Sequence, residues 1–169
     1  MHDQSIQTTD IPPWQAIKKN LRELIRAWNA AHKSVFGFHW KKIPPFCWAY
    51  PQVDYLRIQR VMETIKQQAE QQAAIANRLQ KAAENTPGAA PLRAYYLAVA
   101  PYAQALVPVC THLQTIAAIK QEKLVKGKMG LGNFNHSLKD YEKAIEHLKS
   151  RVDPMRIAWN NLEPSQRGS

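Results

Sequence analysis

Residues 94–119 read AYYLAVAPYAQALVPVCTHLQTIAAI and contain no Asp, Glu, Lys or Arg. A transmembrane helix needs roughly 20 predominantly apolar residues. This stretch is instead interrupted by polar residues and prolines, at Pro101, Gln104, Pro108, His112 and Gln114. We therefore predict a buried central helical segment and no stable membrane insertion. Each interior proline removes a backbone donor and clashes with the preceding turn, so we expect kinks or a break between Ala100 and Pro108.

Amphipathic helices are predicted before this stretch, because apolar residues recur there every three or four positions. The first helix is expected to start after the capping carboxylate of Asp10 and the Pro12–Pro13 pair. Its apolar face comprises Trp14, Ile17, Leu21, Leu24, Ile25, Trp28 and Ala31. The second, from Gln52 to about Glu84, is expected to be the longest helix of the chain. Its apolar face comprises Val53, Leu56, Val61, Ile65, Ala69, Ala73, Ala76 and Leu79. The alanines that follow Ile65 predict a close helix neighbour.

Three further helical segments are predicted towards the C-terminus. One continues over residues 109–125, and the next carries Leu138, Tyr141, Ile145, Leu148 and Val152 on one face. Asp153–Pro154 is expected to start a short final helix, and residues 164–169 are expected to fray. Because no long run of alternating apolar and polar residues predicts strands, the expected fold is an all-α bundle of five or six helices. We interpret residues 1–169 as one domain, in which the turn at 85–90 is the best candidate for an internal boundary.

Two irregular segments separate these helices. Residues 35–51 read VFGFHWKKIPPFCWAYP, where one glycine and three prolines exclude a continuous helix and the aromatic rings predict a packed loop. Residues 127–133 read GKMGLGN and form a basic, Gly-rich loop near residue 130. This loop lacks the order of a nucleotide-hydrolysis motif. Contact with phosphates through backbone amides and a plain linker both remain open interpretations.

The positive charge is concentrated in two parts of the chain. Lys and Arg number 23 against 13 Asp and Glu, which gives a net charge of +10 and a pI near 9.8. Residues 1–50 and 91–132 each carry a net +4, whereas residues 51–90 and 133–169 each carry +1. An excess of this sign indicates an anionic partner, and clustered cations that neutralise phosphates make binding strongly salt-dependent.

These two basic centres supply the candidate nucleic-acid-binding residues. The first centre comprises Lys18, Lys19, Arg22, Arg26, Lys33, His39, Trp40, Lys41 and Lys42. The second comprises Lys120, Lys123, Lys126 and Lys128. Trp40 is the ring expected to be accessible for stacking on an unpaired base, while most other rings of its loop are expected to be buried.

No reaction centre is predicted. The six histidines lack the spacings of helix-borne zinc sites, and Cys110 and His112 point to different faces of a helix. Glu142 and Glu146 lie among basic residues and are typical of a solvated helix face. We therefore expect no catalytic residue, metal or cofactor, although a site assembled from distant residues remains open. Cys47 and Cys110 are interpreted as reduced thiols, and the polar N-terminus predicts a cytoplasmic location.

The resulting hypothesis is a non-catalytic protein that binds the phosphate backbone of RNA or single-stranded DNA without sequence specificity. In size, helical class and basic charge the chain resembles the small helical subunits of RNA-guided CRISPR effector complexes. That resemblance implies other protein subunits as partners and assigns no individual residue. The alternative is a helical adaptor that binds protein partners or an acidic membrane surface, supported by the charge-free segment 94–119.

Overall fold

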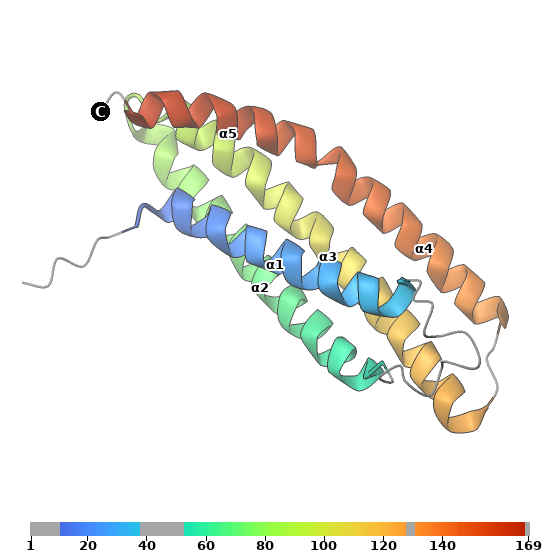
Figure 1. Cartoon of the computed structure of the whole chain (residues 1–169). Coiled ribbons are helices and arrows are strands. Elements are labelled where there is room, and N and C mark those ends of the chain that lie inside the picture. Colours follow the sequence, from blue (N-terminus) through green and yellow to red (C-terminus); the bar gives the residue numbers. More distant parts are fainter. Residues whose placement is uncertain (1–10, 38–52, 128–130, 168–169) are drawn as a thin grey trace, which may run out of the picture.

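The computed structural model describes residues 11–37, 53–127 and 131–167, and within them all regular structure is helical (Figure 1). The elements are α1 (Pro13–Phe36), α2 (Tyr55–Ala82), the 3₁₀ turn η3 (Ala83–Asn85), α3 (Ala90–Lys126), α4 (Leu131–Ser150) and α5 (Val152–Arg167). The predicted all-α class is confirmed. The Pro- and aromatic-rich loop falls mostly at 38–52, outside the described residues.

The helices of the described residues form four rods, because α4 and α5 are nearly continuous, so the predicted bundle of five or six helices is not confirmed. Only Arg151 separates α4 from α5, and the two follow one another along one side of the molecule (Figure 1). A new helix begins one residue before the expected cap, because Asp153 lies in the first turn of α5. Val152, predicted on the apolar face of the preceding helix, is instead the first residue of α5 and is exposed. α5 then continues through Pro164 to Arg167, beyond the point where fraying was expected.

α3 is the central and longest helix, with 37 residues against 28 in α2. The prediction that α2 is the longest is therefore wrong. Of the predicted kinks or break, the break is wrong, because Pro101 and Pro108 both lie inside the continuous α3. An interior proline costs about 3 kcal/mol. Full burial of one Val or Leu side chain contributes about 1.5–3 kcal/mol, and Leu106 and Val109 beside the prolines are completely buried. Burial against the other helices thus offsets the local penalty.

The most extensive contact in the fold lies between α2 and α3. The predicted alanine face is confirmed, since Ala69, Ala73 and Ala76 are buried, as is Ala103 on α3. Small side chains let the two helix axes approach closely. At the start of α2 the predicted face is wrong for Leu56, which is exposed; Ile58 and Met62 are buried instead, because they continue the spacing that leads to Ile65.

α1 lies on α2 and α3 through the predicted apolar face. Ile17, Leu21 and Leu24 are buried in the common core. The N-cap position is Pro12, whose carbonyl accepts from the amides of Gln15 and Ala16. The expected cap Asp10 lies outside the described residues.

The connection between α3 and α4 is shorter than the predicted Gly-rich loop. Gly127 ends α3 in the left-handed conformation, with φ of 70°, and its amide donates to the carbonyl of Lys123. Glycine adopts this conformation without steric cost. Gly132 already belongs to α4, and residues 128–130 lie outside the described part of the chain.

Candidate functional site

Two aromatic bridges join α1 to the α4–α5 rod. At the first, the ring centroids of Trp14 and Trp159 lie 5.3 Å apart, and the Lys18 ammonium lies 3.0 Å from the Trp159 centroid. The Tyr95 ring of α3 lies 5.7 Å from Trp159, and its hydroxyl donates to the Trp14 carbonyl at 3.4 Å. Side chains therefore connect α1 with α5, although within the described residues the two backbones do not touch.

The second bridge connects the C-terminal half of α1 with Tyr141 of α4. The Trp28 indole donates to the Tyr141 hydroxyl at 3.1 Å, and that hydroxyl lies 2.8 Å from Nδ1 of His32. The Phe36 ring stacks on Tyr141 at 5.7 Å. Burial lowers the pKa of His32 and so favours the neutral ring beside the Tyr141 hydroxyl.

The burial of His32 predicts a pH-dependent stability. Because the folded-state pKa of His32 is below its ordinary value of 6.5, the unfolded chain binds the proton more tightly. The contribution of His32 is thus present above pH 6.5 and is lost as the pH falls through the folded-state pKa. We expect His32→Gln to lose less stability than the wild type between pH 7.5 and pH 5 in urea unfolding.

The matched control for this prediction is His147→Gln, which replaces an exposed histidine of α4. Its free energy of unfolding should change between pH 7.5 and pH 5 by the same amount as that of the wild type. Lys120 of α3 has its ammonium 5.1 Å from the Phe36 centroid, and it stays unchanged in both variants. An identical pH dependence in His32→Gln and the wild type would contradict the prediction.

Between the two bridges lies a groove of about 380 Å³, built by α1, α3 and α5. Its floor is apolar and comprises Leu21, Ile25, Tyr95, Tyr102, Val152 and Met155. Its rim carries four cations, Lys18, Arg22 and Arg26 from α1 and Arg156 from α5, and no acidic residue of the described ranges lines it. Arg156 is paired with Asp153 at 2.9 Å, whereas Arg22 and Arg26 form no ion pair in the described part of the chain.

The basic residues of α1 share one face of the helix, which we call the α1 ridge. The ridge comprises Lys18, Lys19, Arg22, Arg26 and Lys33. At 3.6 residues per turn these five positions fall within about 100° of the helix circumference. All except Lys18 are exposed. The one acidic residue of α1, Glu23, lies outside this arc and lines a separate groove towards α2. The charges of α1 are thus segregated, with the cations facing α5 and solvent.

The structure brings together part of the first predicted basic centre. Lys18, Arg22 and Arg26 meet at the groove, and Lys19 lines an adjoining hollow with Trp14 and Trp159. Lys33 follows Arg26 by seven residues and so continues the same face. The other predicted members, His39, Trp40, Lys41 and Lys42, lie outside the described residues, as does Lys128 of the second centre.

The second basic centre meets the first at the C-terminal end of α1. The Lys120 ammonium of α3 donates to the Val35 carbonyl at 2.7 Å, where the last turn of α1 presents unpaired carbonyls and the negative end of its dipole. This contact gives Lys120 a structural role. Lys126 pairs with Glu122 at 2.7 Å, and Lys123 is exposed.

Sequence reasoning missed the contribution of α5 to this site. Arg156 was not singled out because residues 133–169 carry almost balanced charge. Trp159 was recognised only as an apolar residue of the last helix. Arg156 and Trp159 are three residues apart, which places both on one helix face. This spacing was the one sequence feature that could have linked the cation to the ring. The position of that face against α1 depends on the tertiary packing.

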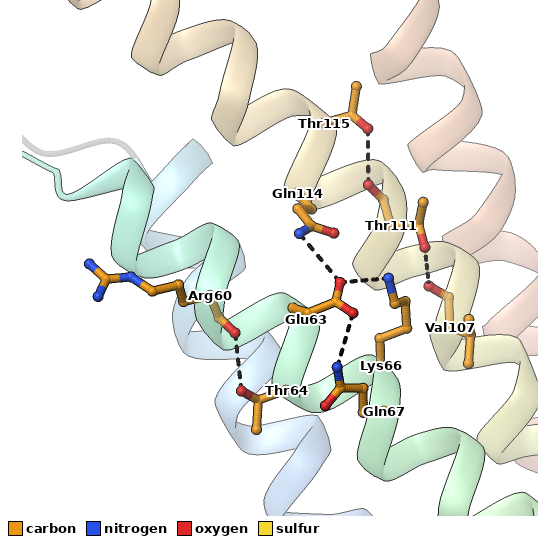
Figure 2. A network of polar contacts seen from close by, with 9 residues as sticks. All are labelled: Arg60, Glu63, Thr64, Lys66, Gln67, Val107, Thr111, Gln114 and Thr115. Atoms are coloured by element: carbon orange, nitrogen blue, oxygen red, sulfur yellow. Dashed lines mark hydrogen bonds and ion pairs between the residues drawn. The ribbon is translucent and has the colours of Figure 1, made fainter.

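A polar network around Glu63 of α2 includes one hydrogen bond to α3 (Figure 2). The Glu63 carboxylate accepts from Lys66 at 2.6 Å, from Gln67 at 3.2 Å and from Gln114 of α3 at 3.5 Å. The hydrogen bond from Lys66 is the main cause that lowers the pKa of Glu63. A carboxylate that is charged and accepts from three donors is suited to a structural role between two helices. It is poorly suited to act as a proton donor.

The buried thiol of Cys110 is unsuited to nucleophilic chemistry. Burial raises its pKa to about 12, so the thiol is protonated at neutral pH. Cys110 is a free cysteine, as expected, and Cys47 lies outside the described residues. The described residues contain no cluster of three His, Cys, Asp or Glu side chains that would hold a metal ion.

In the described ranges, no helix combines the length and the apolar character needed to cross a membrane. No known protein family, curated protein or solved structure matches this chain.

Proposed function

We propose that this protein binds the phosphate backbone of single-stranded nucleic acid through the α1 ridge, without catalysis and without sequence specificity. The observation that carries the proposal is the segregation of charge on α1. Five cations share one face, and Arg22 and Arg26 form no ion pair among the described residues. Cations that the fold leaves uncompensated are available to neutralise phosphates.

Lys33 and Lys120 both lie at the C-terminal end of α1, and they extend the basic surface in that direction. Lys120 contacts the Val35 carbonyl, two residues after Lys33, so the second basic centre begins where the ridge ends. From Lys18 to Lys33 the ridge extends about 22 Å at 1.5 Å per residue. Its length suits a strand of several nucleotides, and a small subunit of a nucleoprotein complex is the role that we propose.

The test is the salt dependence of binding to a fluorescently labelled 20-nucleotide single strand, followed by anisotropy. With about five phosphate contacts the slope of log K against log salt should be about −3.5. Affinity should then fall about 100-fold between 50 and 200 mM salt. Absence of binding at 50 mM salt would exclude the proposed function.

A helical adaptor is the second candidate, supported by exposed apolar side chains on α3. Leu124 and Val125 are neighbours at its C-terminal end, with 57% and 75% of their surfaces exposed. Apolar side chains at this position suit contact with a protein subunit. The two functions respond differently to salt, because burial of apolar surface is not weakened by it. A partner retained at high salt would favour the adaptor.

A further inference from the structure

We propose that the groove between α1, α3 and α5 binds one unpaired base of the strand that the α1 ridge holds. This inference rests on the proposed function and adds a base-binding subsite to it. The groove is beside the ridge: Lys18, Arg22 and Arg26 belong to both. A strand that contacts these cations therefore has its bases within reach of the groove.

The floor of the groove matches a base better than it matches a phosphate. Its residues are aliphatic or aromatic, and the half-buried Trp159 adds a ring beside them. Tyr95 and Tyr102 are 2% and 7% exposed, so the exposed apolar surface comes mainly from the other lining residues. A phosphate is strongly hydrated and gains nothing from such a floor, because burial of a charge without partners is costly. A base has an apolar face that stacks on rings and side chains, and its edge carries the polar groups. The volume of about 380 Å³ is within the range of small-ligand sites.

The rim of the groove matches the charge of a nucleotide. Cations come from both walls, from Arg22 and Arg26 on α1 and from Arg156 on α5, which also pairs with Asp153. Among the described residues no carboxylate lines the groove itself. Phosphates on either side of an inserted base would therefore meet a cation on each wall. The guanidinium groups can also donate to acceptor atoms on the edge of a base, the role that arginine has opposite guanine O6 and N7.

The groove is short along α1. Lys18 and Trp159 line it where the first aromatic bridge lies, and Arg26 is its last lining residue on α1, two residues before Trp28 of the second bridge. Between Lys18 and Arg26 the open part of α1 is about 12 Å long at 1.5 Å per residue. This length suits a single nucleotide rather than a long helix of a partner protein.

The experiment compares two strands of equal charge, oligo(dT) and a strand of the same length in which every nucleotide is an abasic tetrahydrofuran analogue. Both present the same phosphates to the α1 ridge. Stacking of one base contributes roughly 5- to 140-fold in affinity. We expect the wild type to bind oligo(dT) more tightly than the abasic strand by a factor in this range.

A substitution that fills the groove tests its position. Val152→Phe places a ring over the floor from the first turn of α5, where Val152 is already 37% exposed. Ile157→Phe adds the same ring to an exposed position of α5 that does not line the groove. Val152→Phe should bind oligo(dT) as weakly as the abasic strand, while Ile157→Phe keeps the wild-type difference. Circular dichroism verifies that both variants fold.

The outcomes separate failure of this inference from failure of the proposed function. If neither strand binds at 50 mM salt, the proposed function is excluded and the inference with it. If both strands bind equally, backbone binding stands and the base subsite is refuted. A base-dependent gain that survives in Val152→Phe also refutes this site. A separate titration with laurate, an anion with an apolar chain, tests the other occupant. If laurate binds and the two strands bind equally, the groove belongs to an apolar anion and the base subsite is refuted.

Discussion

Replacement of Lys19, Arg22 and Arg26 by alanine is expected to reduce the affinity for a single strand by about 100-fold at 50 mM salt. The three side chains are exposed on the α1 ridge. Each lost phosphate contact removes about 0.7 from the magnitude of the salt slope, so the slope should fall by about 2. Anisotropy titrations of wild type and variant at several salt concentrations measure both quantities.

A matched control distinguishes the ridge from the net charge of the chain. Arg57, Arg60 and Arg78 are exposed on α2, and their replacement by alanine removes the same number of charges. The control should retain most of the affinity, because these side chains lie outside the ridge. Exposed substitutions away from special features change stability by about 0.5 kcal/mol or less, so both variants should remain folded. Equal losses in the two variants would show that net charge alone attracts the strand.

Leu113→Ala is expected to cause the largest loss of stability among the changes considered, about 2–5 kcal/mol. Leu113 is completely buried in α3, the helix on which the other four pack. Truncation removes apolar surface from the core and leaves a cavity that surrounding helices fill only partly. Since domains are stable by about 5–15 kcal/mol, the loss is a large share of the total. Urea unfolding followed by circular dichroism measures it.

Leu97→Ala is the control on the same helix. Leu97 has 54% of its surface exposed, and alanine is a better helix former than leucine. Its free energy of unfolding should stay within about 0.5 kcal/mol of the wild type. If both substitutions had the same effect, α3 would not be the centre of the core.

The buried faces of the helices were predictable because helical periodicity is a local property of the chain. Ile17, Leu21 and Leu24 recur with helical spacing and are buried. The alanines of α2 also predicted the close approach of a neighbour. Leu56 was misassigned because one exposed apolar residue near a helix end is indistinguishable by spacing from a core residue.

The candidate site was predictable only in its α1 part. Lys18, Arg22 and Arg26 are four residues apart, so one helix face follows from their spacing. Arg156 and Met155 could not be assigned, because their place in the groove depends on how α5 packs on α3. The α-helices α2, α3 and α4 lie between Arg26 and Arg156 in the sequence, so no local pattern encodes that both residues line one groove.

By itself the sequence determined the helical class, the buried faces and the basic face of α1, since these follow from residue type and spacing within single helices. Only the tertiary structure decided that α3 continues through Pro101 and Pro108, because the local cost of proline is offset by contacts with other helices. It also decided the groove. That site exists because α3 separates the backbones of α1 and α5, while aromatic side chains join α1 to α5 at Trp159 and α1 to α4 at Tyr141.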